Sequence, residues 1–247
     1  MVKILHLFPK LLNLYGDRGN IAVLGRALSS MGAEVSVTCA EEFEGLDIAS
    51  FDFIYCGSGT ESKIALAAQK LSSFSEQFKT AAEKGTSMLF TGSAMELTCR
   101  EIVSEGKSLP CLGIFNASVR RTADRQTGDV LYESGLSHRI VAGFINKSGF
   151  IRTEEKPLFT PKFGPSSFED GHQLDIPGEG LGKKRVRATY VTGPVLVRNP
   201  WLKNLIATEL FETCEKGSVP AKYSDEYAEK GWAVTVSELE KRMTASR

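Results

Sequence analysis

The sequence predicts an α/β fold in which a central, mostly parallel sheet is flanked by helices, with additional β-hairpins in the second half. In the first half, short apolar runs alternate with longer segments of helical periodicity, and strands separated by helices pair in parallel through right-handed crossovers. Glycine follows both helical segments, at Gly32 and Gly85, as is typical of a helix C-terminus. After residue 112, strand-like segments are joined by loops rich in glycine or proline, which predicts hairpins.

The predicted elements follow in chain order. Strands are expected at residues 2–7, 35–38, 53–56 and 88–91, and helices at 20–31 and 62–84. In the second half we predict strands at 130–133, 140–145, 185–191 and 195–198, a long loop or hairpin at 164–184, and a helix at 201–214. A loop of that length is commonly functional, and this one is a candidate for closing over a site. Residues 1–215 are expected to form one domain, and residues 216–247 a polar, helical extension.

The composition excludes several kinds of partner. Lys and Arg (30) balance Asp and Glu (30), so no net field favours nucleic acid or an anionic membrane surface. The apolar start is interrupted at Pro9 and Lys10, and no later segment has the apolar length of a membrane span, which predicts a cytoplasmic protein. The 5 cysteines lack CxxC spacing, which indicates reduced thiols and no metal site. No cofactor is predicted.

Three loops rich in glycine or small polar residues follow predicted strands, at residues 15–20, 57–62 and 92–94. In a doubly wound sheet, ligands bind beyond the carboxyl ends of the strands, so we expect these loops to converge. Gly92 lies between a strand pattern and a helical pattern, at the corner where many α/β enzymes place a nucleophile. The Gly57-Ser58-Gly59 turn has two interpretations: its N–H groups bind an anion or oxyanion, or it is a tight turn that caps a helix.

Six sequence blocks occur in a characteristic order along the chain. They are LNLYGDRGNI, YCGSGTES, LFTGSAMEL, DRQTGDVL, GFINKSG and ATYVTGPVLVRNPWL, at residues 12–21, 55–62, 89–97, 124–131, 143–149 and 188–202. Together they resemble class I glutamine amidotransferases of the cobyric acid synthase type, above all the glutaminase subunits of lipid II isoglutaminyl synthase. The resemblance implies the class I glutamine amidotransferase-like fold. It also implies a role in cell-wall peptidoglycan amidation beside a Mur-ligase-like, ATP-dependent amidotransferase subunit.

The same resemblance implies a catalytic site without its reactive groups. The family's elbow, Gly-x-Cys-Gly-Gly-x-Gln-Leu, aligns with the block that ends at Glu96 and Leu97, which puts the nucleophilic cysteine at Gly92. The family's catalytic histidine, in a Thr-Tyr-x-His-Gly-Pro block, falls at Thr192. In this chemistry a thiolate attacks the carboxamide and an imidazole moves the proton. The chain is therefore predicted to lack glutaminase activity.

Other parts of the implied site are present. Arg125 falls at the arginine that the resemblance assigns to the glutamine substrate, and Gly57 with Ser58 at the turn assigned to the oxyanion hole. Ser93 follows the vacant elbow, and Lys147 stands where the family's Gly-Phe-Glu-Asn-His-x-Gly block has its histidine. We therefore expect the residues that bind the substrate to be present although the nucleophile and the base are absent.

Three hypotheses follow. In the first, the chain is a non-catalytic subunit that binds the Mur-ligase-like partner, or a sensor that holds glutamine or another small carboxylate through Arg125. In the second, it is an amidohydrolase that uses a non-standard nucleophile, Ser93, Ser58 or Cys56. In the third, it is an experimentally disabled protein, which ranks lowest because three site positions differ. The first is favoured, since glycine cannot act as a nucleophile and none of the 3 histidines falls in the matched blocks.

Overall fold

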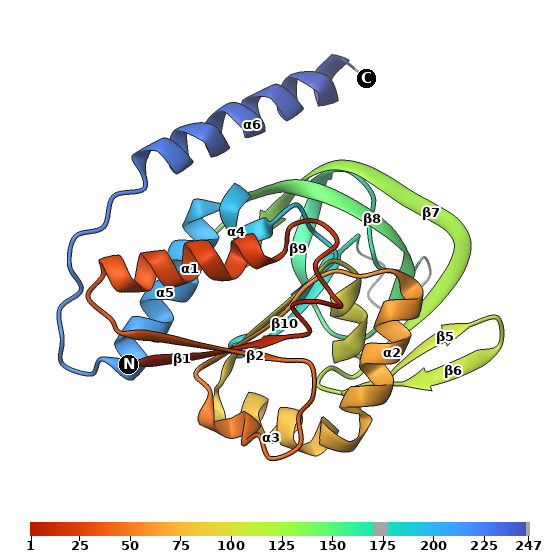
Figure 1. The fold of residues 1–247 in the computed structure, drawn as a ribbon. Helices are drawn as coiled ribbons and strands as arrows, with labels where there is room; N and C mark the ends of the chain where they lie inside the picture. Colours follow the sequence, from red (N-terminus) through yellow and green to blue (C-terminus); the bar gives the residue numbers. More distant parts are fainter. Residues whose placement is uncertain (170–176, 246–247) are drawn as a thin grey trace.

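A computed structural model of the chain describes residues 1–169 and 177–245. Their strands form one mixed sheet in the order β2-β1-β3-β4-β11-β10-β9-β7-β5-β6, with β8 paired to β7. Helices cover both faces of the parallel half (Figure 1). The predicted α/β class, with a parallel sheet that continues into antiparallel hairpins, is confirmed.

The parallel half holds the deepest part of the core. Its strands are β1 (Val2–Leu7), β2 (Val35–Ala40), β3 (Phe53–Cys56), β4 (Ser87–Thr91) and β11 (Val186–Thr189). Every residue of β3 and β4 is buried, as expected for strands covered on both faces. Helices α1 (Arg18–Ser30) and α5 (Pro200–Cys214) lie on one face, and α2 (Glu61–Leu71) and α3 (Ser75–Lys84) on the other (Figure 1).

The second half adds an antiparallel layer. Its strands are β5 (Glu101–Ser104), β6 (Lys107–Pro110), β7 (Ala117–Ser134), β8 (Ile140–Thr153), β9 (Pro157–Phe163) and β10 (Glu179–Lys183). The long β7–β8 hairpin curves away from the parallel strands (Figure 1). Its register shifts between Arg121, opposite Gly149, and Gln126, opposite Lys147. Four residues of β7 therefore bulge against one of β8, and bulges of this kind re-aim side chains beside functional sites.

One predicted helix is divided in the structure, and one predicted strand is a helix. The single helix predicted at 62–84 is divided into α2, a 3-10 turn at Ser72–Phe74 (η2) and α3. The Ser72 hydroxyl donates to the Gln69 carbonyl oxygen at 2.7 Å, and such local bonds compete with a continuous helix. The strand predicted at 195–198 is wrong, because Val195–Arg198 is a short helix, α4. The Leu196 N–H donates to Asn20 Oδ1 at 2.7 Å, which holds the first turn of this helix against α1.

The antiparallel strands are longer than predicted. β7 has 18 residues, far more than the predicted 130–133, and no strand is predicted at β5, β6 or β9. The predicted loop at 164–184 contains β10 near its end. Residues 170–176 of that loop lie outside the described residues.

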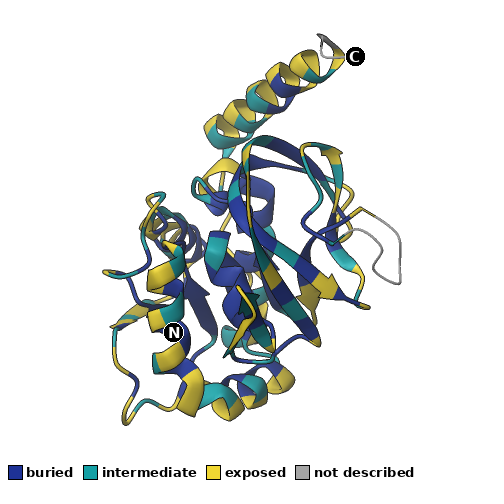
Figure 2. Ribbon diagram, turned by 90° about the vertical axis from the view of Figure 1, so that its right-hand side faces the viewer, coloured by how far each residue is buried: buried dark blue, intermediate teal, exposed yellow. Residues whose placement is uncertain are grey.

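The C-terminal helix α6 (Glu226–Ala245) packs on the β7–β8 hairpin. Val236 and Leu239 are buried against Leu131 of β7 and Ala142 of β8, whereas most of the outer surface of the helix is exposed or half-buried (Figure 2). This face buries little apolar area, so the helix depends on further contacts near its start. None of the helices in residues 1–169 and 177–245 is long and apolar enough to cross a membrane.

Two tryptophans and an arginine tie α6 to the body. The Arg139 guanidinium lies 5.9 Å from the ring centroid of Trp201 and 4.7 Å from that of Trp232. Both indole N–H groups donate to the carbonyl oxygen of Ile140, at 2.9 and 3.0 Å, and Arg139 also pairs with Glu229 of α6 at 2.7 Å. Stacking of a cation on aromatic faces adds to these bonds, so this cluster anchors the first half of the helix.

Candidate functional site

The three loops predicted to converge do so at the carboxyl ends of β1, β3 and β4. Asp17 Oδ1 accepts a hydrogen bond from Thr91 Oγ1 at 3.3 Å and from the Tyr55 hydroxyl at 3.4 Å. Gly57 lies so close to this carboxylate that a Cβ at position 57 would be 2.8 Å from Asp17 Cγ. Burial raises the pKa of Asp17, and hydrogen bonds from neighbouring backbone N–H groups only partly oppose it. The Asp17 carboxylate therefore links the loop after β1 to the ends of β3 and β4.

Gly92 forms the corner at the end of β4. Its φ of +59° lies in the left-handed region, which glycine enters without the steric cost that a Cβ brings. A 3-10 helix, Gly92–Thr98 (η3), begins at this residue. The predicted strand, corner and helical segment are thus present, although the helix is of the tighter 3-10 type rather than an α-helix.

The space beside Gly92 is filled by Ser58. A Cβ added at Gly92 would overlap Ser58 Oγ and would lie 2.8 Å from Ser58 Cβ, well inside the usual carbon–carbon contact distance of about 3.5–4.0 Å. Ser58 Oγ also lies 3.3 Å from Thr192 Oγ1 and donates to the Thr91 carbonyl oxygen at 3.4 Å. Two hydroxyl groups therefore meet where the resemblance places a thiol and an imidazole.

This centre is closed to solvent. Ser58 and Thr192 are each 1% exposed, and Gly92 is buried. Thr192 is fixed by a backbone bridge to Phe144 of β8, with its N–H 2.9 Å from the Phe144 carbonyl oxygen. The hydroxyl pair is therefore held from both sides, by β4 and by β8.

The Gly59 N–H of the glycine turn already has a partner. The Gly59 N–H donates to Ser93 Oγ at 3.0 Å, and the Ser58 carbonyl oxygen accepts from the Leu14 N–H at 3.0 Å. Ser93 Oγ in turn donates to the Gly59 carbonyl oxygen at 2.7 Å, so its hydroxyl proton is engaged as well. The turn is braced internally, which fits its structural interpretation better than an open oxyanion hole.

Cys56 lies at the end of β3, fully buried. Burial and the nearby Asp17 carboxylate raise the pKa of its thiol well above the ordinary value. A thiol that stays protonated is a poor nucleophile, so the local electrostatics do not suit Cys56 to covalent catalysis.

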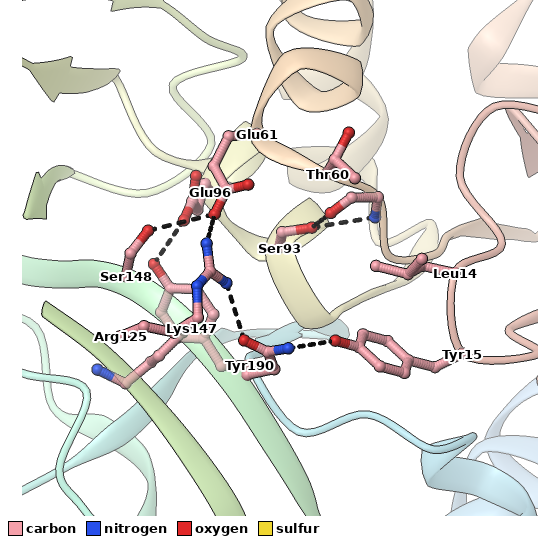
Figure 3. A pocket seen from close by; sticks show the side chains of 12 residues that line it. Leu14, Tyr15, Thr60, Glu61, Ser93, Glu96, Arg125, Lys147, Ser148 and Tyr190 are labelled. Atoms are coloured by element: carbon pink, nitrogen blue, oxygen red, sulfur yellow. Dashed lines mark hydrogen bonds and ion pairs between the residues drawn. The ribbon is translucent and has the colours of Figure 1, made fainter. Parts of the chain in front are cut away.

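A cavity of about 240 Å³ opens beside this centre (Figure 3). Its lining comes from the loops after β1, β3 and β4 and from β7, β8 and the segment after β11: Leu14, Tyr15, Gly59, Thr60, Glu61, Ser93, Glu96, Arg125, Asn146, Lys147, Ser148 and Tyr190. Gly92, Ser58 and Thr192 are not among these residues. A ligand in this cavity would touch Ser93 and Arg125 but not the buried hydroxyl pair.

A chain of polar contacts runs along the rim of the cavity (Figure 3). The Tyr15 hydroxyl accepts from Asn146 Nδ2 at 2.7 Å, and Asn146 Oδ1 accepts from Arg125 Nη1 at 2.8 Å. Arg125 Nη2 then donates to Glu61 Oε1, to which Ser148 Oγ also donates at 3.4 Å. Arg125 stands on the bulge of β7, which aims its side chain at the start of α2.

Behind the rim, Glu96 and Lys147 are buried. Glu96 accepts two hydrogen bonds from Arg121, at 2.9 and 2.6 Å, and one from the Tyr190 hydroxyl at 3.1 Å. Lys147 Nζ donates to the Gly149 carbonyl oxygen at 3.2 Å and lies 4.0 Å from the Phe150 ring centroid. Burial lowers the pKa of Lys147 to about 8.

The candidate residues thus divide into two groups. Gly92, Ser58 and Thr192 form the closed centre, while Ser93 and Arg125 face the cavity. Sequence reasoning missed the filling of the Gly92 corner by Ser58 and the partners of Arg125, which are Glu61 and Asn146. Ser58, Glu61 and Asn146 all lie in the matched blocks, but the order of the blocks does not indicate which side chains contact one another. Among the described residues, no group of three or more His, Cys, Asp or Glu side chains could hold a metal ion.

Comparisons with known proteins identify the family of the chain. Residues 3–200 match the family described as CobB/CobQ-like glutamine amidotransferase domain. The chain is 30% identical over 218 residues to the lipid II isoglutaminyl synthase (glutamine-hydrolyzing) subunit GatD of Staphylococcus aureus (strain N315), covering 88% of this chain and 86% of that protein. It is 27% identical over 211 residues to the GatD subunit of Streptococcus pneumoniae (strain ATCC BAA-255 / R6), covering 84% and 79%.

Solved structures of low sequence identity share the fold. The chain superposes on PurLQS from Thermotoga maritima with a TM-score of 0.54 at 11% identity, covering 87% of this chain and 99% of the other. A crystal structure of a glutamine amidotransferase gives a TM-score of 0.52 at 19% identity, covering 83% and 97%. These similarities concern the backbone arrangement alone.

Proposed function

The chain belongs to the CobB/CobQ-like glutamine amidotransferase family, and from this premise we propose that it is a member that does not hydrolyse glutamine. The observation that carries the proposal is the closed centre at the elbow. Ser58 Oγ lies in the space of the missing nucleophile and 3.3 Å from Thr192 Oγ1 at the position of the missing base. Neither hydroxyl group can serve as the general base, and a hydroxyl without such a base is a weak nucleophile.

The chemistry explains why this arrangement is expected to be inactive. Attack on a carboxamide needs an ionised or base-activated nucleophile and a group that protonates the leaving ammonia. Losing one member of such a catalytic unit typically costs on the order of a thousandfold or more in rate, and the losses do not add because the members act together. A member that lacks both groups is expected to have no useful glutaminase activity.

The alternative nucleophiles are each placed unfavourably. Ser58 is buried and does not line the cavity, so a bound amide would not reach it. Ser93 does line the cavity, but its hydroxyl is bonded to both backbone groups of Gly59. Burial keeps the Cys56 thiol protonated. These placements favour the non-catalytic subunit over an amidohydrolase with a non-standard nucleophile.

The related proteins suggest what such a subunit does. Both GatD relatives are subunits of lipid II isoglutaminyl synthase, so we infer a role as a cytoplasmic binding subunit in peptidoglycan amidation. Its partner is then a Mur-ligase-like subunit that activates a carboxylate with ATP. Without glutamine hydrolysis, the nitrogen in such a complex comes from free ammonia or another donor. The cavity beside Arg125 is the candidate site for glutamine or another small carboxylate.

The experiment that tests this proposal measures glutamate release from L-glutamine by the purified protein, alone and with a co-expressed Mur-ligase-like partner. A Ser58→Gly/Gly92→Cys/Thr192→His variant is the positive comparison, because it clears the corner and restores both reactive groups. We expect the natural protein to be silent in both settings. Glutamate release by the natural protein at the rate of the restored variant contradicts the proposal, and Ser58→Ala, Ser93→Ala and Cys56→Ala then identify the nucleophile.

A further inference from the structure

The ion pair between Arg125 and Glu61 stands at the rim of the cavity, not in the core. The Arg125 side chain is 46% exposed and the Glu61 side chain 43% exposed. Both residues line the cavity, and Figure 3 shows the two charged groups facing each other across its edge. Exposed ion pairs contribute little to stability, so this pair can open without unfolding its surroundings.

Each partner has support that remains when the pair opens. Arg125 Nη1 donates to Asn146 Oδ1 at 2.8 Å, and Asn146 is itself held by the Tyr15 hydroxyl. Glu61 is the first residue of α2, where the positive end of the helix dipole stabilises a carboxylate. In the closed pair, partial burial opposes its ionisation, but its own backbone N–H and the Arg125 guanidinium outweigh that effect and lower the pKa of Glu61; the backbone N–H remains when the pair opens. An opened pair therefore presents a fixed cation and a fixed anion.

The other charged groups of the lining are already committed. Glu96 is paired with Arg121 and is 2% exposed. Lys147 is also 2% exposed and donates to the Gly149 carbonyl oxygen. Among the described residues that line the cavity, Arg125 and Glu61 are thus the charged side chains that a ligand can reach and exchange.

This arrangement discriminates between ligands by charge. A simple carboxylate that binds Arg125 must displace Glu61 and leave its negative charge beside the ligand, which like-charge repulsion disfavours. A ligand that carries a carboxylate and an ammonium group replaces both partners at once, because its carboxylate pairs with Arg125 and its ammonium with Glu61. The ion pair between Arg125 and Glu61 is replaced by one ion pair from each residue to the ligand, so no charged group is left without a partner.

We propose that Glu61 is a specificity-determining residue of this cavity, which makes Arg125 accept a carboxylate only from a zwitterion such as a free α-amino acid. The inference rests on the proposed function in taking the cavity as a small-molecule site. It adds that Glu61 excludes purely anionic carboxylates.

The test compares two probes that differ by one ammonium group, L-glutamine and glutaric acid monoamide. Their affinities for the full chain are measured by titration calorimetry, and glutamate release is assayed in the same samples. We expect the wild-type protein to prefer L-glutamine. In Glu61→Gln, the monoamide should bind about 3- to 10-fold more tightly than it binds the wild type, from the removal of one exposed pair and one repulsion, and the preference for L-glutamine should disappear.

Glu83→Gln is the matched control. It removes the same charge from a surface glutamate that pairs with Lys183 and Lys184 and does not line this cavity, and it should leave both affinities unchanged. Thermal melting checks that the variants are folded. An unchanged preference in Glu61→Gln overturns the inference, as does a wild-type protein that binds the monoamide as tightly as L-glutamine or binds neither probe. Glutamate release instead counts against the proposed function, so the two failures are distinguishable.

Discussion

Restoring a cysteine at the elbow should destabilise the protein unless Ser58 is removed first. In Gly92→Cys the new Cβ overlaps Ser58 Oγ and lies 2.8 Å from Ser58 Cβ. The hydroxyl can rotate away, but Ser58 Cβ is fixed to the backbone, so the overlap remains. Overpacking of a core typically costs about 1–3 kcal/mol, and a side chain at the left-handed φ of +59° adds about 1 kcal/mol.

A double-mutant cycle isolates the contact between positions 58 and 92. Unfolding in urea is measured for the wild type, Gly92→Cys, Ser58→Gly and the double variant, and the left-handed backbone cost cancels because it is common to both cysteine variants. We expect the pair to be more stable than the sum of its single changes by about 1–3 kcal/mol. Ser58→Ala, which keeps the crowding Cβ, should rescue Gly92→Cys less than Ser58→Gly does. Additive free energies of unfolding would refute the claim that Ser58 fills the corner.

Three further predictions concern other parts of the molecule. Lys147→Met should raise the free energy of unfolding at pH 7 by about 1–3 kcal/mol. Burial lowers the pKa of Lys147 from 10.5 to about 8. The free energy of unfolding of the wild type should therefore rise between about pH 8 and 10.5, and the difference from the variant should shrink there. Equal dependence of the two free energies of unfolding on pH would contradict this prediction. Trp232→Ala removes the indole hydrogen bond to the Ile140 carbonyl oxygen and one of the two aromatic rings that contact Arg139. It should speed limited proteolysis between α5 and α6 about tenfold or more. An unchanged rate of proteolysis would show that this cluster does not anchor α6. Iodoacetamide should label the exposed Cys39 in the native protein and the buried Cys56 after unfolding; mass spectrometry that finds native Cys56 labelled first would reinstate it as a nucleophile.

The parts of the fold that follow apolar patterns could be predicted from the sequence. β3 (Phe53–Cys56) begins and ends where predicted because it is an apolar run bounded by the Gly57 turn, and all its residues are buried. The middle of β7 could not be predicted in this way, since residues 120–129 are mostly exposed or half-buried and lack an alternating apolar pattern. The amino acids at 195–198 favour a strand, but the segment is helical. The side chains of Asn20 and Asn199 hydrogen-bond the backbone of Leu196 and Val195 and stabilise this helical turn.

The site shows the same division. The sequence alone shows that position 92 carries no nucleophile, because this depends only on the identity of one residue, Gly92. The closure of the corner is not, since it depends on Ser58, which is 34 positions away in the chain, adopting one rotamer toward Gly92 and Thr192. The pairing of Arg125 with Glu61 likewise joins residues 64 positions apart and arises from the bulge in β7, which the sequence does not reveal.

The crowding of the elbow by Ser58 also limits the routes by which this chain could gain a nucleophile at position 92. A Cβ at position 92 and Ser58 in its present rotamer overlap, so a cysteine fits this corner only if the backbone shifts or Ser58 is replaced. Gly92→Cys alone would give a strained protein with a threonine still at position 192, where the resemblance implies the base. The side chain at position 58 would therefore make a cysteine nucleophile hard to gain at this elbow by single substitutions.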